Sequence, residues 1–204
     1  MSSAVTKLRM LAERAHCFAR RVRSDIGGMA AVEFGYLAPV MLLMLIGTVE
    51  VSRAVAMDRK FGLATALVAD LVAREKTMSA ANLNAIYDIV AHVMSPYDTS
   101  SLKIGVVPVK ANPTNASNTE VYAATLNRPS YHGATQPARC SAYGLTTGLL
   151  AAGSSVIVVE TSYTYTPILT GSIFGSKNWT DKAILSPRNS CVDFDNDNCV
   201  STCF

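Results

Sequence analysis

The clearest feature of the sequence is an apolar stretch near its start, from Met29 to Val49, in which Glu33 is the one formally charged residue. At about 1.5 Å of rise per residue, a helix over this stretch reaches roughly 31 Å, enough to cross the hydrocarbon core of a bilayer. Gly35 and Pro39 would be awkward inside a soluble helix, whereas membrane spans tolerate them. The pattern therefore predicts a transmembrane helix over residues 29–49.

A second apolar pattern follows the first without a break. No proline occurs between Val51 and Lys76, and apolar residues recur there at steps of three and four, the spacing of one helix face. We therefore expect one rod from about residue 30 to 76, with Gly62 as a weak point where it would bend. The predicted apolar stripe consists of Ala54, Met57, Phe61, Ala64, Val68 and Leu71.

A shorter helix is predicted after the rod. Ser79 is a suitable N-cap residue, and Ser95-Pro96 supplies a stop, because the residue before a proline disfavours the helical conformation. Between these signals one face is apolar, which indicates a helix packed on a core. That face consists of Leu83, Ile86, Tyr87, Val90, Val93 and Met94.

After Pro96 the sequence changes to strands and turns. Strands are predicted over residues 102–109, 155–165 and 179–185, where β-branched and aromatic residues gather. Pro108 indicates an edge strand or a bulge, residues 111–139 indicate mostly loop, and residues 146–152 suggest a short helix. Because the strands follow the helices in one block, we expect an α+β fold with a small antiparallel sheet.

Charge is distributed unevenly along the chain. Residues 1–28 hold six basic and two acidic residues, a net +4, so the rest of the chain, whose total is +3, carries −1. Basic residues beside a span favour a cytoplasmic N-terminus. Without interleaved aromatic residues or a binding fold, the basic segment does not indicate nucleic-acid binding. A cleaved secretory signal is the alternative, but no Ala-x-Ala followed by a turn ends the apolar run, and Glu50-Val51-Ser52-Arg53 continues in helical style, so a retained anchor is favoured.

Five cysteines divide between the two sides of the predicted membrane. Cys17 lies on the cytoplasmic side, where a free thiol is expected. An even number of cysteines follows the span, in a compartment that permits disulfides, and no Cys-x2-Cys spacing indicates a metal site. We therefore expect two disulfides, and the sequence leaves all three possible pairings open. The four cysteines are Cys140, Cys191, Cys199 and Cys203.

The start of the apolar run holds the strongest functional signal. Gly28 ends the basic leader, and Glu33 is the fifth residue after it, as in a type IV prepilin. Cleavage after Gly28 would leave Met29 with a free ammonium at the edge of the hydrocarbon, where Glu33 of a neighbouring helix would neutralise it. The alternative is that Gly28 is merely flexible and Glu33 reaches back to the membrane surface.

These residues resemble a known family. The run from Gly28 through Val32-Glu33-Phe34 and Ala38-Pro39 to the exit pattern Gly47-x-x-Glu50-x-x-Arg53 is similar to the TadE/TadG-like proteins of tight-adherence (Tad, or Flp) pilus systems over residues 29–73. No Asp-x-Ser-x-Ser signature of the larger TadG type occurs, so the TadE type fits better. Ile26-Gly27 departs from the basic residues common before the cleavage glycine.

The resemblance implies a pilin-like fold and a minor pseudopilin that takes part in pilus assembly, adhesion and biofilm formation. It implies processing at Gly28, Met29 and Glu33, and places Glu33, Phe34, Pro39 and Glu50 at helix-packing positions. The implied partners are membrane lipid, other pilins or pseudopilins, Tad inner-membrane assembly proteins and a prepilin peptidase, with no nucleic acid. The alternative is an uncleaved single-pass scaffold or binding module of a secretion or pilus apparatus.

The expected organisation follows from these observations. The N-terminus would lie in the cytoplasm of a bacterium, the span in the inner membrane, and the rest in the periplasm, with entry into the pilus left open. The expected divisions are a basic leader at residues 1–28, the span at 29–49, a helical stalk at 50–95 and a strand-rich disulfide-bonded domain at 96–204.

Metal and catalytic motifs add little. The alternating carboxylates of Asp193, Asp195 and Asp197 begin like a calcium loop, but the glycine and the closing glutamate of an EF-hand are missing, so a solvated acidic turn is favoured over a weak calcium site. Cys140 and His132 suggest a thiol and base only if Cys140 is not in a disulfide. No hydrolase or phosphate-loop motif is present. We expect no cofactor and no enzyme activity.

Overall fold

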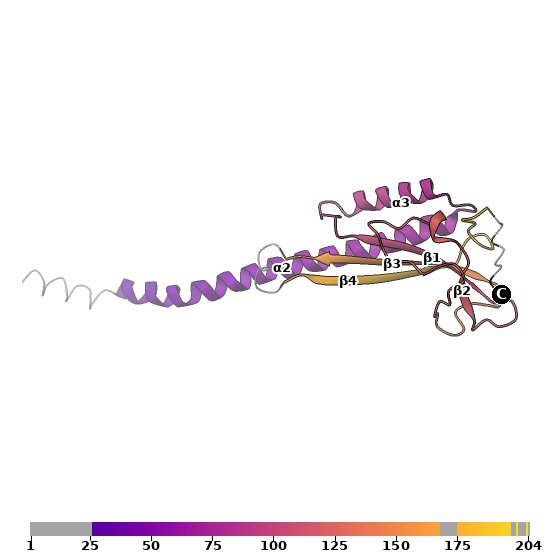
Figure 1. Ribbon diagram of the computed structural model, residues 1–204. Coiled ribbons are helices and arrows are strands. Elements are labelled where there is room, and N and C mark those ends of the chain that lie inside the picture. The colour runs from indigo at the N-terminus through magenta and orange to yellow at the C-terminus, as the bar shows by residue number, and fades with distance from the viewer. Residues whose placement is uncertain (1–25, 168–174, 197–198, 200–202, 204) are drawn as a thin grey trace, which may run out of the picture. The chain divides into compact units, whose positions relative to one another are not determined.

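The computed structural model describes residues 26–167, 175–196, 199 and 203, and has an α+β fold (Figure 1). The predicted basic leader up to residue 25, including Cys17, lies outside the described residues. The chain divides into two compact units, Met1–Val49 and Glu50–Phe204. The elements are α2 (Ile26–Arg74), α3 (Ala80–Val93), β1 (Lys103–Ala111), β2 (Thr119–Val121), the short 3-10 helix η1 (Thr125–Asn127), β3 (Ser155–Tyr165) and β4 (Lys177–Leu185).

Helix α2 confirms the predicted rod, with bounds of Ile26 and Arg74 instead of residues 30 and 76. Met57, Phe61 and Val68 are buried in the core of the second unit, so the three- and four-residue spacing located the packed face correctly. Ala64 is buried beside them, and Ala54 and Leu71, at the two ends of the stripe, are partly buried.

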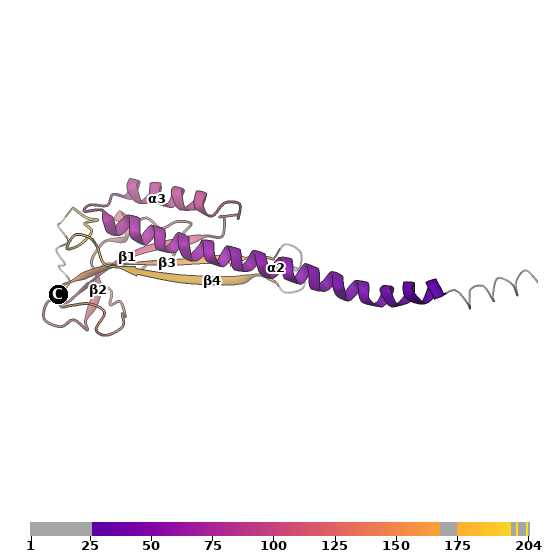
Figure 2. The same ribbon diagram turned by 180° about the vertical axis from the view of Figure 1, so that it is seen from behind.

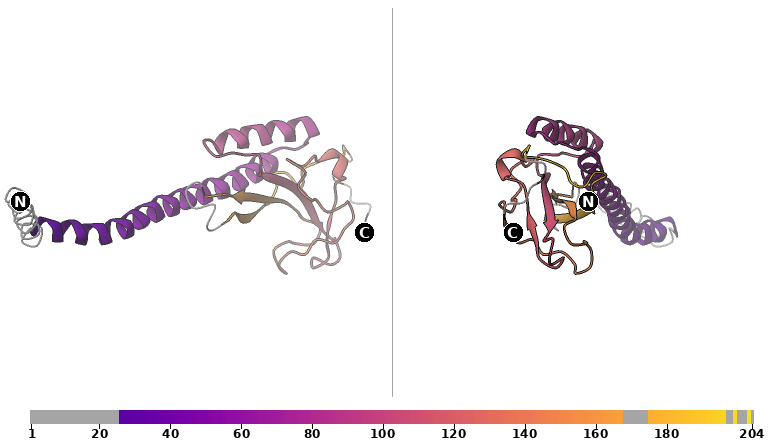
Figure 3. Two further views of the ribbon diagram at one scale, coloured as in Figure 1. Left: turned by 60° about the vertical axis from the view of Figure 1, so that its left-hand side comes forward. Right: turned by 90° about the vertical axis from the view of Figure 1, so that its right-hand side faces the viewer.

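Helix α3 confirms the second predicted helix. The Ser79 hydroxyl caps its start by accepting a hydrogen bond from the main-chain nitrogen of Asn82 at 3.2 Å. The face formed by Leu83, Ile86, Tyr87 and Val90 is buried, as the spacing predicts. Helix α3 and the part of α2 in the second unit lie on the same side of the sheet (Figures 1, 2 and 3).

The four strands form one antiparallel sheet in the order β2-β1-β3-β4. The register pairs Val106 of β1 with Val159 of β3, and Tyr163 of β3 with Trp179 of β4. The three predicted strands and their antiparallel pairing are confirmed. Strand β2 was not predicted, because its three residues lie in a segment rich in asparagine, proline, serine and threonine.

Pro108 lies in the interior strand β1, so the expected edge or bulge needs correction. Its carbonyl accepts a hydrogen bond from the Tyr122 nitrogen, on the side of β1 that faces β2. Because the nitrogen and the carbonyl of one strand residue point to the same side, the donor that Pro108 lacks also faces that side. Strand β2 ends at Val121, so its ladder with β1 does not extend to Pro108, and the nearest main-chain pairing on this side is an isolated bridge between Ile104 and Tyr131. The β3 ladder on the other side of β1 is undisturbed.

The short helix suggested for residues 146–152 is wrong. Main-chain turns occupy this segment, and Gly148 and Gly153 adopt positive φ angles of 87° and 75°. Glycine takes this conformation without the steric cost that a Cβ imposes, and it ends a helix. The segment instead brings Leu150 onto the face of the sheet opposite the helices, where Val107 and Val158 lie.

The loop after β2 is organised by a fully buried arginine, Arg128. Its guanidinium donates to the carbonyl oxygens of Ala123 at 3.1 Å and Val106 at 2.9 Å, to Gln136 Oε1 at 3.1 Å, and to the carbonyl of Pro137. Burial lowers the pKa of Arg128 to about 10, although the negative charge of Asp195 opposes this shift. Arg128 thus fastens a segment without regular structure to strand β1.

We expect Arg128→Met to lower the free energy of unfolding by about 3 kcal/mol, because it leaves several buried carbonyl oxygens without a donor. Urea unfolding of the full-length protein in detergent, followed through the fluorescence of its single tryptophan, Trp179, measures the change. The exposed Arg188 supplies the control, Arg188→Met, with an expected effect within about 0.5 kcal/mol. Equal midpoints for the two variants would contradict the role of Arg128.

Candidate functional site

The N-terminal part of α2 presents large apolar side chains around its whole circumference. Phe34 is 67% exposed, Leu43 68% and Met44 69%. A helix on the surface of a soluble protein keeps one polar face, whereas one that is apolar all round requires an apolar environment. By length and composition, α2 is the one helix among the described residues that qualifies to cross a membrane. The chain thus has an apolar helix suited to a single-pass anchor.

The predicted processing residues lie on this exposed part of the helix. Gly28, Met29 and Glu33 are all exposed. A Cβ built at Gly28 would meet no atom within 4 Å, and the same holds at Gly35. Packing against the described residues therefore does not require glycine at Gly28. Phe34 is exposed beside them, and Pro39 lies inside the helix.

The predicted helix-packing residue Glu50 has a different environment. It is the first residue of the second unit and is buried, 8% exposed. The Tyr165 hydroxyl donates to its Oε2 at 3.4 Å, and the Tyr165 ring stacks on Trp179 with centroids 4.9 Å apart. Burial, followed by the negative charge of Glu50, raises the pKa of the Tyr165 phenol. Glu50 thus connects α2 to the end of β3.

The strand end at Tyr165 was indicated by its sequence. Strand β3 stops there, as the predicted strand over residues 155–165 does, and Pro167 follows two residues later. The sequence did not reveal the contact between Tyr165 and Glu50, because 115 positions separate them along the chain.

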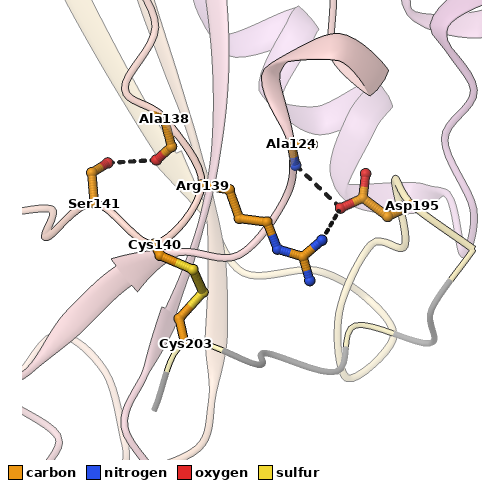
Figure 4. The surroundings of a disulfide bond; sticks show 7 residues. All are labelled: Ala124, Ala138, Arg139, Cys140, Ser141, Asp195 and Cys203. Carbon is orange, nitrogen blue, oxygen red and sulfur yellow. Dashed lines mark hydrogen bonds and ion pairs between the residues drawn. A yellow bond between two sulfur atoms is a disulfide. The ribbon is translucent and has the colours of Figure 1, made fainter.

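The four cysteines after the span form two disulfides, which confirms their predicted number. The structure selects the pairs Cys140–Cys203 and Cys191–Cys199 (Figure 4 shows the first). A disulfide at Cys140 removes it as a free thiol. His132 instead lies with Nδ1 3.1 Å from the carbonyl oxygen of Leu102, so these residues form no thiol and base pair.

Asp195 lies near the first disulfide and makes several contacts (Figure 4). Its carboxylate forms an ion pair with Arg139 at 3.1 Å and accepts hydrogen bonds from the Ala124 nitrogen at 3.1 Å and from Asn127 Nδ2 at 2.6 Å. Asp193 accepts a hydrogen bond at 3.1 Å from the nitrogen of Asp195. The carboxyl-terminal segment is thereby held against the loop that follows β2.

This geometry bears on the calcium candidates. Asp193 and Asp195 lie close together, but an arginine already faces the carboxylate of Asp195. Asp197 lies outside the described residues, and among the residues that are described no three acidic, histidine or cysteine side chains gather as metal ligands would. The sequence places Arg139 directly before Cys140, and a basic residue beside a cysteine that is joined to the carboxyl-terminal segment could have indicated an ion pair with one of the aspartates.

We expect Asp195→Asn to lower the free energy of unfolding by about 2 kcal/mol, because it removes a mostly buried charge that faces Arg139. Urea unfolding of the oxidised full-length protein measures the effect. Asp70→Asn is the matched control: Asp70 pairs with Arg74 on the exposed surface of α2, and such pairs contribute at most about 0.5 kcal/mol. If the two variants unfold alike, Asp195 does not fasten this segment.

Comparison with known proteins gives one match. Residues 28–70 match the model of the family described as TadE-like protein. No curated protein and no solved structure matches the chain. The matched segment begins at Gly28, contains Glu33 and Glu50, and ends near the end of α2. The resemblance inferred from the sequence is confirmed: residues 28–70 of the chain are similar to the TadE-like family.

Proposed function

We propose that the protein is a minor pseudopilin that takes part in the assembly of a Tad (Flp) pilus. The observation that carries the proposal is the coincidence of the TadE-like match with the helix whose N-terminal part is apolar on all sides. Such a helix serves first as an anchor in lipid and then as a packing surface among other pilin helices. The expected partners are pilins, other pseudopilins and Tad inner-membrane assembly proteins.

The proposed topology places the N-terminus in the cytoplasm and the second unit in the periplasm of a bacterium. The basic leader supports this orientation, because positive residues are retained on the cytoplasmic side. The disulfides Cys140–Cys203 and Cys191–Cys199 support it independently, because the periplasm permits such bonds and the cytoplasm keeps thiols reduced.

In the proposed mechanism, a prepilin peptidase cleaves after Gly28 and leaves Met29 with a free ammonium group. Glu33 lies on the exposed part of α2, free to meet a neighbouring subunit. A carboxylate at this depth of the bilayer costs a few kcal/mol without a partner. Pairing with the ammonium of a neighbouring helix neutralises both charges and sets the axial offset between the subunits.

The second unit would then act as a rigid periplasmic domain rather than a catalyst. Within this unit, α2 packs into the core through Met57, Phe61 and Val68. The role is therefore structural. The rival is an uncleaved single-pass scaffold of the same apparatus, which Ile26-Gly27 before the cleavage site favours.

Processing separates these two functions. In cells with an active prepilin peptidase we expect the mature chain to begin at Met29, and Gly28→Val to retain residues 1–28, as intact mass would show. Gly35→Val is the matched control, since a side chain has equal space at both glycines, and it should be processed normally. A wild-type chain that keeps its leader would support the scaffold instead.

The pairing argument predicts that Glu33→Gln remains in the membrane but assembles poorly. Loss of a charge pair where water is scarce should reduce crosslinking to pilin partners about tenfold or more. Crosslinked complexes are measured in membranes that carry equal amounts of each variant. Glu75→Gln, an exposed acid near the other end of α2, should crosslink like the wild type. Normal crosslinking of Glu33→Gln would count against the pairing.

A further inference from the structure

A hollow opens in the second unit beside the start of its helical segment. It has a volume of about 440 Å3 and is lined by residues of α2, of the segment that follows α3, and of the end of β3. The lining residues that matter for its chemistry are Arg53, Tyr97, Asp98, Ser100 and Tyr165. None of them belongs to the processing residues or to the disulfide cluster.

The hollow lies close to the end of the predicted span in the sequence. Arg53 is four residues beyond Val49, which corresponds to about 6 Å along a helix. The polar headgroup layer on each side of a bilayer is about 5–7 Å thick, so Arg53 falls at its level. Tyr165, which lines the hollow from the end of β3, donates a hydrogen bond to Glu50, the residue directly after the predicted span.

Both signs of charge are present in the hollow. Arg53 is exposed and supplies a guanidinium, the group best suited to a phosphate. Lys60, also on α2, lies 5.6 Å from the ring centre of Tyr97 and adds a second positive charge nearby. Asp98 is the one acidic residue of the lining, and its hydrogen bonds with Ser100 lower its pKa, so it stays ionised.

Aromatic rings also line the hollow. Tyr97 and Tyr165 line the hollow, and Trp179 stacks on Tyr165. Tyrosine and tryptophan are enriched at the membrane–water interface, because their rings suit the apolar side and their polar groups the wet side. Their faces also attract an ammonium group. A cation, an anion and aromatic rings within one hollow match a zwitterionic headgroup better than a purely anionic one.

We propose that this hollow binds the headgroup of a phosphatidylethanolamine-type lipid, with Arg53 on the phosphodiester and Asp98 on the ammonium. The proposal rests on the proposed membrane anchoring, which places the hollow at the surface of the bilayer. Binding there would hold the base of the domain to lipid before the subunit leaves the membrane for the pilus.

The test uses the full-length protein in mixed micelles that hold equal amounts of phosphatidylethanolamine, phosphatidylglycerol and phosphatidylcholine. Native mass spectrometry then counts the lipids that each variant retains. We expect the wild type to retain phosphatidylethanolamine over phosphatidylcholine. Arg53→Gln should lower the retention of phosphatidylethanolamine about fivefold, the effect of one basic residue at a lipid surface.

A second variant, Asp98→Asn, tests the proposed contact with the lipid ammonium separately. It keeps an acceptor for Ser100 but removes the charge that would hold the ammonium. The variant should therefore lose phosphatidylethanolamine and gain phosphatidylglycerol, a reversal that misfolding would not produce. The matched controls are Arg59→Gln on α2 and Asp88→Asn on α3, exposed charges outside the lining, and both should behave like the wild type.

Three results would overturn the proposal. They are equal retention of the three lipids by the wild type, equal behaviour of Arg53→Gln and Arg59→Gln, or displacement of the lipid by an equal concentration of free phosphoethanolamine, which would indicate a soluble ligand. Carbonate extraction of membranes distinguishes a failure of the proposed membrane anchoring from a failure of the lipid-binding proposal. A chain released into the soluble fraction refutes the anchor itself, whereas a retained chain without lipid preference refutes the hollow alone.

Discussion

One helix has to satisfy two different apolar environments, and the rest of the structure depends on this constraint. Along its N-terminal part α2 is apolar on every side, whereas from Met57 onward it buries a single stripe in a protein core. A continuous helix meets both demands because its main-chain hydrogen bonds are internal and independent of the surroundings. Only the side chains change, from apolar on all faces to apolar on one. The fold of the second unit is built around that stripe.

The features that the sequence predicted well are those in which the type of each residue depends on its own local environment. The stripe of α2, the Ser79 cap of α3 and the β-branched run of β3 are local and periodic, so their spacing identified them. The spacing of apolar residues along a helix or strand is the same whichever element packs against it. The antiparallel pairing also followed, because among the described residues no α-helix lies between one strand and the next.

The features that were missed depend on contacts between distant residues. Arg128 lies in a segment that reads as loop, and its partners are mostly main-chain oxygens, which leave no trace in a sequence. Strand β2 has three residues and exists because β1 offers it a partner. The turns around Gly148 were taken for a helix because the neighbouring leucines and alanines suit either structure. The processing residues were found from the pattern alone, and their role stays a proposal.

The disulfide between Cys140 and Cys203 has a consequence for biogenesis. Cys140 is synthesised 63 residues before its partner Cys203, so the chain between them stays open until synthesis has reached Cys203. In the proposed topology, where the second unit is periplasmic, this disulfide can form only after the whole region between the two cysteines has been exported. In that topology, a closed Cys140–Cys203 bond would mark a subunit whose export is complete.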